Sequence, residues 1–122
     1  MATLPAGARK PSANPRPKEQ RAWMRYPCNL KIHCRLVAVT PGKSWPAWAM
    51  DISAGGLRIL FNYPLQPGAF LIMDLSNVFQ GFSHTALVRV VRTASQPYSE
   101  RWILGCAFVH ALDEKILRSL LL

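Results

Sequence analysis

The feature that most constrains the fold of this chain is a series of short segments in which apolar and polar residues alternate. In residues 29–36 the apolar residues fall on every second position, at Leu30, Ile32, Cys34 and Leu36. Because successive side chains of a β-strand point to opposite faces, this period of two predicts a half-buried strand. Further segments that favour strands follow at 45–52, 57–61, 70–75, 85–92 and 102–109.

Residues that form turns separate these segments, with Gly, Pro, Asn or Ser clustered in each connection. The stretch from Ser53 to Gly56 predicts a hairpin turn between the second and third strands. We find no helical pattern between the strands. Six short strands with such connections predict an all-β fold, a six-stranded antiparallel barrel.

The end of the chain has a different periodicity. Five apolar residues recur at helical spacing, namely Leu112, Ile116, Leu117, Leu120 and Leu121. Asp113 and Glu114 stand at the start of this run, where carboxylates interact favourably with the helix dipole. We therefore expect one terminal helix whose apolar stripe packs against the barrel or a partner chain, and we favour the barrel.

The chain has 122 residues, a length that suits one domain. Residues 1–19 are rich in Pro, Ala and basic residues without apolar periodicity, so they predict a disordered, flexible basic arm, and the domain is expected to occupy residues 20–122. No apolar run is long enough to span a bilayer, and residues 1–18 lack the apolar segment of a secretory signal. We expect a cytoplasmic protein without stable membrane insertion.

The net charge of +9 predicts an anionic partner. Residues 1–25 contain six of the fifteen basic residues and only one of the six acidic residues. A nucleic acid, an anionic membrane surface or a phosphorylated small molecule would each account for this bias.

The cysteines and histidines show no pattern of a metal or catalytic site. Cys28, Cys34 and Cys106 lack the spacing of zinc ligands and are expected to be reduced thiols, the latter two packed in the core. No nucleophile is paired with a base, and no glycine-rich nucleotide loop is present. We expect no metal, no cofactor and no enzymatic activity.

Two motifs are candidates for ligand recognition. Arg21 and Arg25 are four residues apart in a stretch bracketed by prolines, which favours a turn or extended arm over a helix. Arginine offers a rigid fork of donors for phosphate oxygens or the O6 and N7 edge of guanine.

The second motif is Asp51-Ile52-Ser53-Ala54-Gly55-Gly56, at the expected mouth of the barrel. A carboxylate accepts hydrogen bonds from the N1 and N2 donors of guanine, and a serine hydroxyl bonds in either sense. Gly56 adds space, because a residue without a Cβ atom can take a positive φ and lets a ligand approach the backbone closely. Taken alone, the motif also suits an ordinary Asp and Ser turn.

Together these motifs resemble the signature of the PilZ family, RxxxR followed by [DN]xSxxG, over roughly residues 20–121. The resemblance implies a receptor for cyclic di-GMP, in which Arg21 and Arg25 hold phosphates and guanine edges, Asp51 and Ser53 bond the ligand, and Gly56 shapes the turn. It further implies that the arginine arm becomes ordered on binding and signals to a downstream protein. Further candidate contacts are Gln20, Trp23 and Gly55.

Two alternatives remain open on the sequence alone. One is a PilZ-like adaptor that contacts proteins without binding a ligand, and the other is a basic β-barrel that binds single-stranded nucleic acid. No strand carries the array of aromatic and basic residues typical of an RNA-binding sheet, and DNA is not an expected partner. The stretch from Pro41 to Trp48 is a candidate loop whose Trp45 and Trp48 belong either to the core or to a partner surface.

Overall fold

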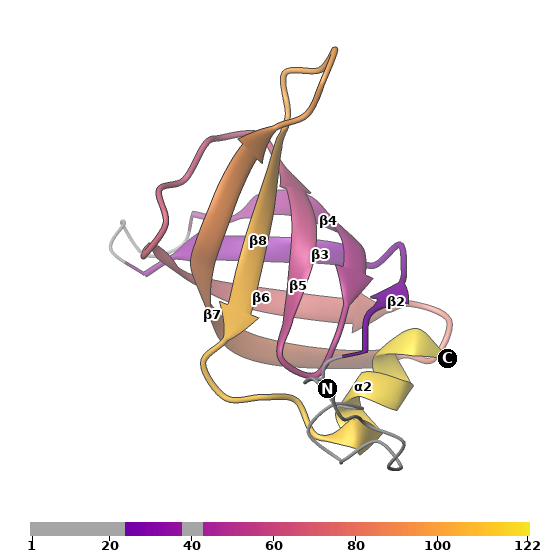
Figure 1. Cartoon of the computed structure of the whole chain (residues 1–122). Coiled ribbons are helices and arrows are strands. Elements are labelled where there is room, and N and C mark those ends of the chain that lie inside the picture. Colours follow the sequence, from indigo (N-terminus) through magenta and orange to yellow (C-terminus); the bar gives the residue numbers. More distant parts are fainter. Residues whose placement is uncertain (1–23, 38–42) are drawn as a thin grey trace, which may run out of the picture.

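The computed structural model describes residues 24–37 and 43–122, which form a closed antiparallel β-barrel and one C-terminal helix (Figure 1). The elements are β2 (Tyr26–Pro27), β3 (Lys31–Leu36), β4 (Trp45–Ile52), β5 (Gly56–Phe61), β6 (Phe70–Asn77), β7 (Phe82–Ser95), β8 (Trp102–Phe108) and α2 (Glu114–Leu121). The predicted all-β fold with a terminal helix is confirmed. The predicted basic arm at 1–19 lies outside the described residues.

The barrel closes because β5 pairs with β4 as well as with β8. Around the barrel the order is β4, β3, β6, β7, β8, β5. The short β2, which the sequence pattern did not predict, pairs with Asp51 and Ile52 of β4. Strand β5 pairs with one edge of β4. Strands β2 and β3 therefore both pair with the other edge, β2 near the end of β4 and β3 near its start. The two are therefore parts of one interrupted strand, and the barrel has the six strands that the alternation predicts.

The interior is filled by the apolar face of each strand. Twelve large side chains are essentially inaccessible to solvent, among them Phe61, Ile32, Met73 and Leu104. Burying a side chain of this size stabilises the fold by about 1.5–3 kcal/mol each. Cys34 and Cys106 lie in this core as free thiols, as expected, and burial raises the pKa of each to about 12.

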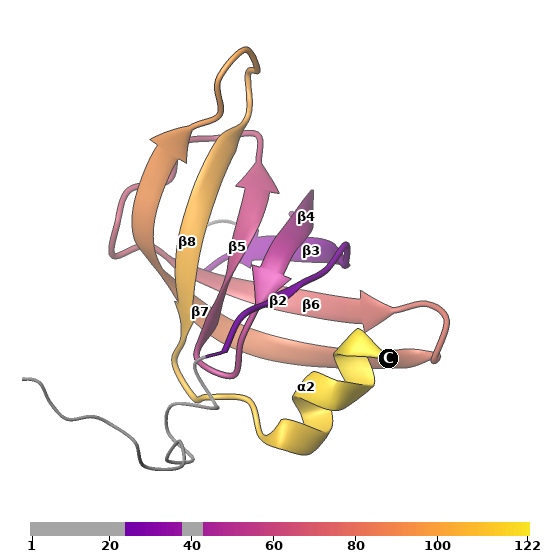
Figure 2. The ribbon, with the colours of Figure 1, turned by 45° about the vertical axis from the view of Figure 1, so that its right-hand side comes forward.

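Helix α2 packs against β6 and β7 at the end of the barrel opposite the β7–β8 hairpin (Figure 2). Asp113 caps its N-terminus by accepting a hydrogen bond from the Ile116 amide at 2.8 Å. Leu117 and Leu120 are buried, which confirms that the apolar stripe packs on the barrel. Among the described residues, no helix is long and apolar enough to cross a membrane.

Strand β7 is longer than the predicted segment 85–92, because its two halves pair with different strands. Residues 82–89 pair with β6, whereas residues 88–95 pair with β8. Figure 1 shows the resulting bend, where β7 leaves β6 and turns to run beside β8. Trp45 and Trp48 belong to β4, with Trp45 packed against the core and Trp48 exposed.

Candidate functional site

A row of directly opposed residues crosses the outer face of four strands. Asp51 on β4 lies opposite Arg58 on β5, and Arg58 lies opposite Gly105 on β8. Gly105 in turn lies opposite Arg92 on β7. Opposed residues on neighbouring strands lie close enough for their side chains to interact. The row therefore places one carboxylate and two guanidinium groups on one surface, with a glycine between the arginines.

A bulge in β4 turns Asp51 toward this surface. Ala47 and Ala49 face the core, and strict alternation would place Asp51 there as well. The register shifts between Ala49 and Asp51, so Met50 is an extra residue. After this bulge Ile52 faces the core and Asp51 faces outward, opposite Arg58. Re-aiming a side chain in this way is a common use of β-bulges near functional sites.

A second bulge does the same for Arg92 on β7. Val88 and Val90 are fully buried, and the register shifts between Val90 and Arg92. Val91 is the extra residue, and its exposed side chain lies outside the core. Arg92 therefore faces outward on the same surface as Arg58.

Asp51 is the centre of an ion-pair cluster. Its Oδ1 atom accepts a hydrogen bond from Nη1 of Arg25 at 2.6 Å, and its Oδ2 atom accepts one from Nε of Arg58 at 2.6 Å. Asp51 is only 7% exposed, whereas the side chains of Arg25 and Arg58 are 48% and 49% exposed. Two charge-assisted partners compensate the burial of this carboxylate, and the cluster retains a net positive charge at its surface.

The chain at Arg25 is held near Asp51 by β2. Pro27 lies opposite Asp51, and the Cys28 amide donates a hydrogen bond to the Met50 carbonyl at 3.1 Å. Residues 24 and 25 are not helical, in agreement with the extended arm expected from the flanking prolines. The pairing of β2 with β4 thus places Arg25, the second arginine of the RxxxR motif, beside the carboxylate of Asp51 in the second motif.

Ser53 organises the turn between β4 and β5. Its Oγ atom accepts hydrogen bonds from the Gly55 and Gly56 amides, each at 3.2 Å, and the Ser53 amide donates to the Gly56 carbonyl at 2.8 Å. Ser53 is 2% exposed. The Ser53 hydroxyl therefore stabilises the turn. The contact between Ser53 and the ligand, which the resemblance implies, stays a prediction.

Gly56 is required by close packing and does not adopt the positive φ that a glycine can take. Among the described glycines, only Gly68 and Gly81 have positive φ. A Cβ atom on Gly56 would lie 2.2 Å from the Cys106 carbonyl oxygen, which is far inside any real contact. The absence of a side chain lets β5 and β8 meet at this end of their ladder.

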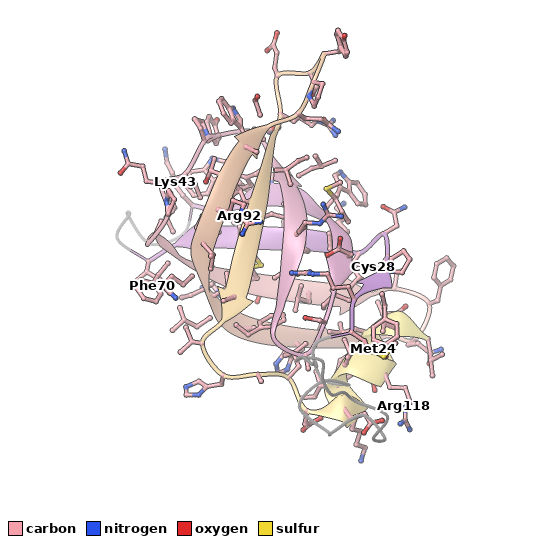
Figure 3. The ribbon with its side chains drawn as sticks, viewed as in Figure 1. Met24, Cys28, Lys43, Phe70, Arg92 and Arg118 are labelled. Carbon is pink, nitrogen blue, oxygen red and sulfur yellow. The ribbon has the colours of Figure 1, made fainter. Side chains whose placement is uncertain are left out.

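A pocket of about 390 Å³ lies along the row. Gly105 lies between Arg58 and Arg92, where a larger residue would fill the space between them. The lining residues are Arg25, Ser53, Gly55, Gly56, Arg58, Val91, Arg92, Ala94, Ile103, Gly105, Cys106 and Ala107. Figure 3 shows Arg92 on this face, over β8.

The structure brings together the described members of both motifs. Arg25, Ser53, Gly55 and Gly56 line the pocket, and Asp51 pairs with arginines that line it. Gln20, Arg21 and Trp23 lie outside the described residues.

Sequence reasoning did not identify Arg58, Arg92 and Gly105 as site residues. The alternation of Leu57, Ile59 and Phe61 predicts that Arg58 points outward, and the structure shows this orientation. This outward orientation could have made Arg58 a candidate site residue, because Arg58 follows the second motif closely in the sequence. Arg92 and Gly105 belong to the site because the register of β7 and β8 places them opposite each other. This register cannot be read from the sequence.

Within residues 24–37 and 43–122, no group of three or more His, Cys, Asp or Glu side chains is arranged to hold a metal ion. Burial raises the pKa of the half-buried Cys28 thiol as well as those of the two core thiols. The polar side chains at the pocket are Arg25, Arg58, Arg92 and Ser53, with the Asp51 carboxylate beside them.

Comparisons with known proteins give one family match and several solved structures with a similar fold. The family model of the PilZ domain matches residues 15–122. A search of curated proteins found no match. Among solved structures, the inhibitor of motility MotI/DgrA of Bacillus subtilis is 17% identical with a TM-score of 0.63, and the match covers 86% of this chain and 53% of that protein.

Two further similar structures contain cyclic di-GMP. The PilZ domain of YcgR from Escherichia coli is 15% identical with a TM-score of 0.57, over 83% of this chain and 86% of that domain. PlzA of Borreliella burgdorferi is 12% identical with a TM-score of 0.58, over 84% of this chain and 50% of that protein. The chain thus spans about half the length of the Bacillus and Borreliella proteins.

Proposed function

The chain belongs to the PilZ domain family, and from this premise we propose that it is a receptor domain for cyclic di-GMP. The observation that carries the proposal is the cluster of Arg25, Asp51 and Arg58 beside a pocket on the outer face of the barrel. The YcgR and PlzA structures, which share this fold, hold the same dinucleotide.

The groups at the pocket complement those of the ligand. Cyclic di-GMP carries two phosphate charges and two guanines, and half-exposed arginines are suited to bind phosphate oxygens. The Asp51 carboxylate is an acceptor for the N1 and N2 donors of a guanine. A generic polyanion would also bind the arginines, but it would gain nothing from a carboxylate acceptor.

We propose that binding rearranges the ion pairs, because Asp51 is almost fully buried and each of its oxygens already accepts a hydrogen bond from an arginine. A guanine that reaches the carboxylate displaces at least one arginine, and a ligand phosphate then receives the freed guanidinium group. Arg25 is the better candidate for this exchange, since it precedes the two-residue β2, whereas Arg58 lies within the β5 ladder. We propose that the exchange orders the segment carrying Arg21 and Arg25 over the ligand.

We also propose that binding is relayed to a protein partner. Phe70 and Leu87 expose apolar side chains on the outer faces of β6 and β7. Arg89 lies between this apolar surface and the pocket, because it is opposite Phe70 on one side and opposite Ala107 on the other. The neighbouring Arg89 favours a partner that combines apolar side chains with carboxylates.

The relay can be tested in cells with a photoreactive side chain in place of Leu87. A cross-link to a partner should depend on an intact Arg25, because ligand occupancy would then control docking. Cross-linking that persists equally in an Arg25→Ala background would instead support a ligand-independent adaptor.

Calorimetric titration with cyclic di-GMP tests the receptor function directly. Wild-type protein should bind, and Arg25→Ala should bind at least about tenfold more weakly because it loses a charge-assisted contact. Arg118→Ala is the matched control, since Arg118 lies on α2 and pairs with Glu114 outside the pocket. GTP and an oligonucleotide test selectivity. No heat from cyclic di-GMP at high concentration, or equal losses in both variants, would reject the proposal.

A further inference from the structure

We infer that Arg92 determines the guanine specificity of the pocket by binding the O6 and N7 edge of one guanine of the ligand. This inference rests on the proposed function. It assigns a role to a residue outside both sequence motifs, on a strand that neither motif reaches.

Arg92 differs from the other two arginines that line the pocket. Arg25 and Arg58 are both bound to Asp51. The Arg92 side chain makes no hydrogen bond or ion pair with any residue that the structure describes, and it is exposed. Its guanidinium fork is therefore available to a ligand without first breaking a contact within the described chain.

The backbone around Arg92 provides room for a planar ligand group. The bulge at Val91 directs Arg92 outward, and the residue opposite it is Gly105. A Cβ atom on Gly105 would lie 3.6 Å from the Arg92 Cβ atom and would meet nothing else closer than 4.0 Å. The space above Gly105 is thus open between Arg92 and Arg58.

The surroundings of Arg92 suit a base better than a phosphate. Val91, Ala94 and Ile103 provide apolar lining at this end of the pocket. A purine ring gains by covering such side chains, whereas a phosphate would lose hydration beside them. The opposite end, with Arg25 and Arg58 around Asp51, is the cationic one.

The two ends of the row are too far apart to serve a single small group. Asp51 and Arg92 are separated by three strand spacings, or roughly 14 Å between backbones. A ligand with two bases can occupy both ends, with one guanine near Asp51 and the other near Arg92. The arginine fork matches the two acceptors of guanine, whereas adenine presents a donor at the corresponding position.

Substitutions of Arg92 separate base reading from phosphate binding. We would measure dissociation constants of cyclic di-GMP and cyclic di-AMP for wild type, Arg92→Ala, Arg92→Lys and Arg92→Gln. Arg92→Ala should lower the preference for cyclic di-GMP by about 10- to 100-fold, as expected for loss of a bidentate pair. Arg92→Lys should show a similar loss although it keeps the charge, because lysine lacks the fork. Arg92→Gln should shift the preference toward cyclic di-AMP.

The outcomes are distinct. If Arg92→Ala weakens both dinucleotides equally and Arg92→Lys restores both, Arg92 binds a phosphate and the inference is wrong. Unchanged affinity and preference in all three variants would also overturn it. If wild type binds cyclic di-GMP, the proposed function stands whatever the Arg92 variants show. If wild type does not bind it, both the proposed function and this inference fail. Thermal unfolding checks that each variant keeps the fold, as expected for an exposed side chain.

Discussion

Replacing Gly56 with alanine tests whether this glycine is required for barrel closure. The new Cβ atom would lie 2.2 Å from the Cys106 carbonyl oxygen and 3.3 Å from the Ala107 Cα atom. Both are backbone atoms, so no side-chain rotation relieves the clash. Strands β5 and β8 would have to separate by about 1 Å at this end, since strain of this kind is relieved only by backbone shifts.

The expected cost follows from the contacts that this separation disturbs. Inserting a methyl group into a tightly packed site costs about 1–3 kcal/mol. The bond from the Phe108 amide to the Gly55 carbonyl, 2.9 Å long, lies at the same end and contributes about 0.5–1.5 kcal/mol. Gly56→Ala should therefore lower the free energy of unfolding by about 2–4 kcal/mol. For a domain of this size, we expect the melting temperature to fall by roughly 10 °C or more.

Gly105→Ala is the matched control, because it adds the same methyl group on the neighbouring strand. Its Cβ atom would lie 3.6 Å from Arg92, an ordinary contact. We expect stability within about 0.5 kcal/mol of wild type but weaker binding of cyclic di-GMP, because the methyl group enters the pocket. Urea unfolding followed by circular dichroism measures the first effect and calorimetry the second. The packing argument is refuted if Gly56→Ala is as stable as wild type.

Three further predictions concern the ion-pair cluster, the helix and the thiols. Asp51→Asn should weaken binding of cyclic di-GMP at least about tenfold in calorimetry, because it removes the charge that pairs two arginines. Asn77→Ala should cost about 2–3 kcal/mol in urea unfolding, since the Asn77 side chain donates to carbonyls at the end of α2 at 3.0–3.2 Å. The folded-state pKa values of Cys34 and Cys106, about 12, exceed the ordinary 9.0, so their contribution to stability is complete below pH 9 and is lost toward pH 12. In native protein at pH 8, a thiol reagent should therefore modify Cys28 first.

The strands were predictable because burial imposes alternation directly on the sequence. The core positions Ile32 and Cys34 on β3 follow the period of two and are fully buried. The short β2 was not predictable, since two residues are too few to show a period. The full length of β7 was also hidden, because each half faces different neighbours and the polar residues at both ends resemble connections.

The bulges explain why only part of the site could be derived from the sequence. On β4 the core residue after Ala49 is Ile52, three positions later, whereas a regular strand would place it two positions later. A step of three can indicate either a bulge or a turn. It can be assigned to a bulge only once the bounds of the strand are known. Arg92 and Gly105 become neighbours through the register of β7 and β8, and no local pattern in the sequence contains that information.

The turn that carries Ser53 also connects the pocket to the helix. The Gly55 carbonyl accepts a hydrogen bond from the Phe108 amide at 2.9 Å, and the Ala54 carbonyl accepts one from the Leu112 amide at 2.8 Å. Leu112 is buried and directly precedes Asp113, which caps α2. Hydrogen bonds therefore join the turn that borders the pocket to the segment that leads into the helix. Because these bonds join backbone groups, the connection does not depend on which side chains stand at these positions.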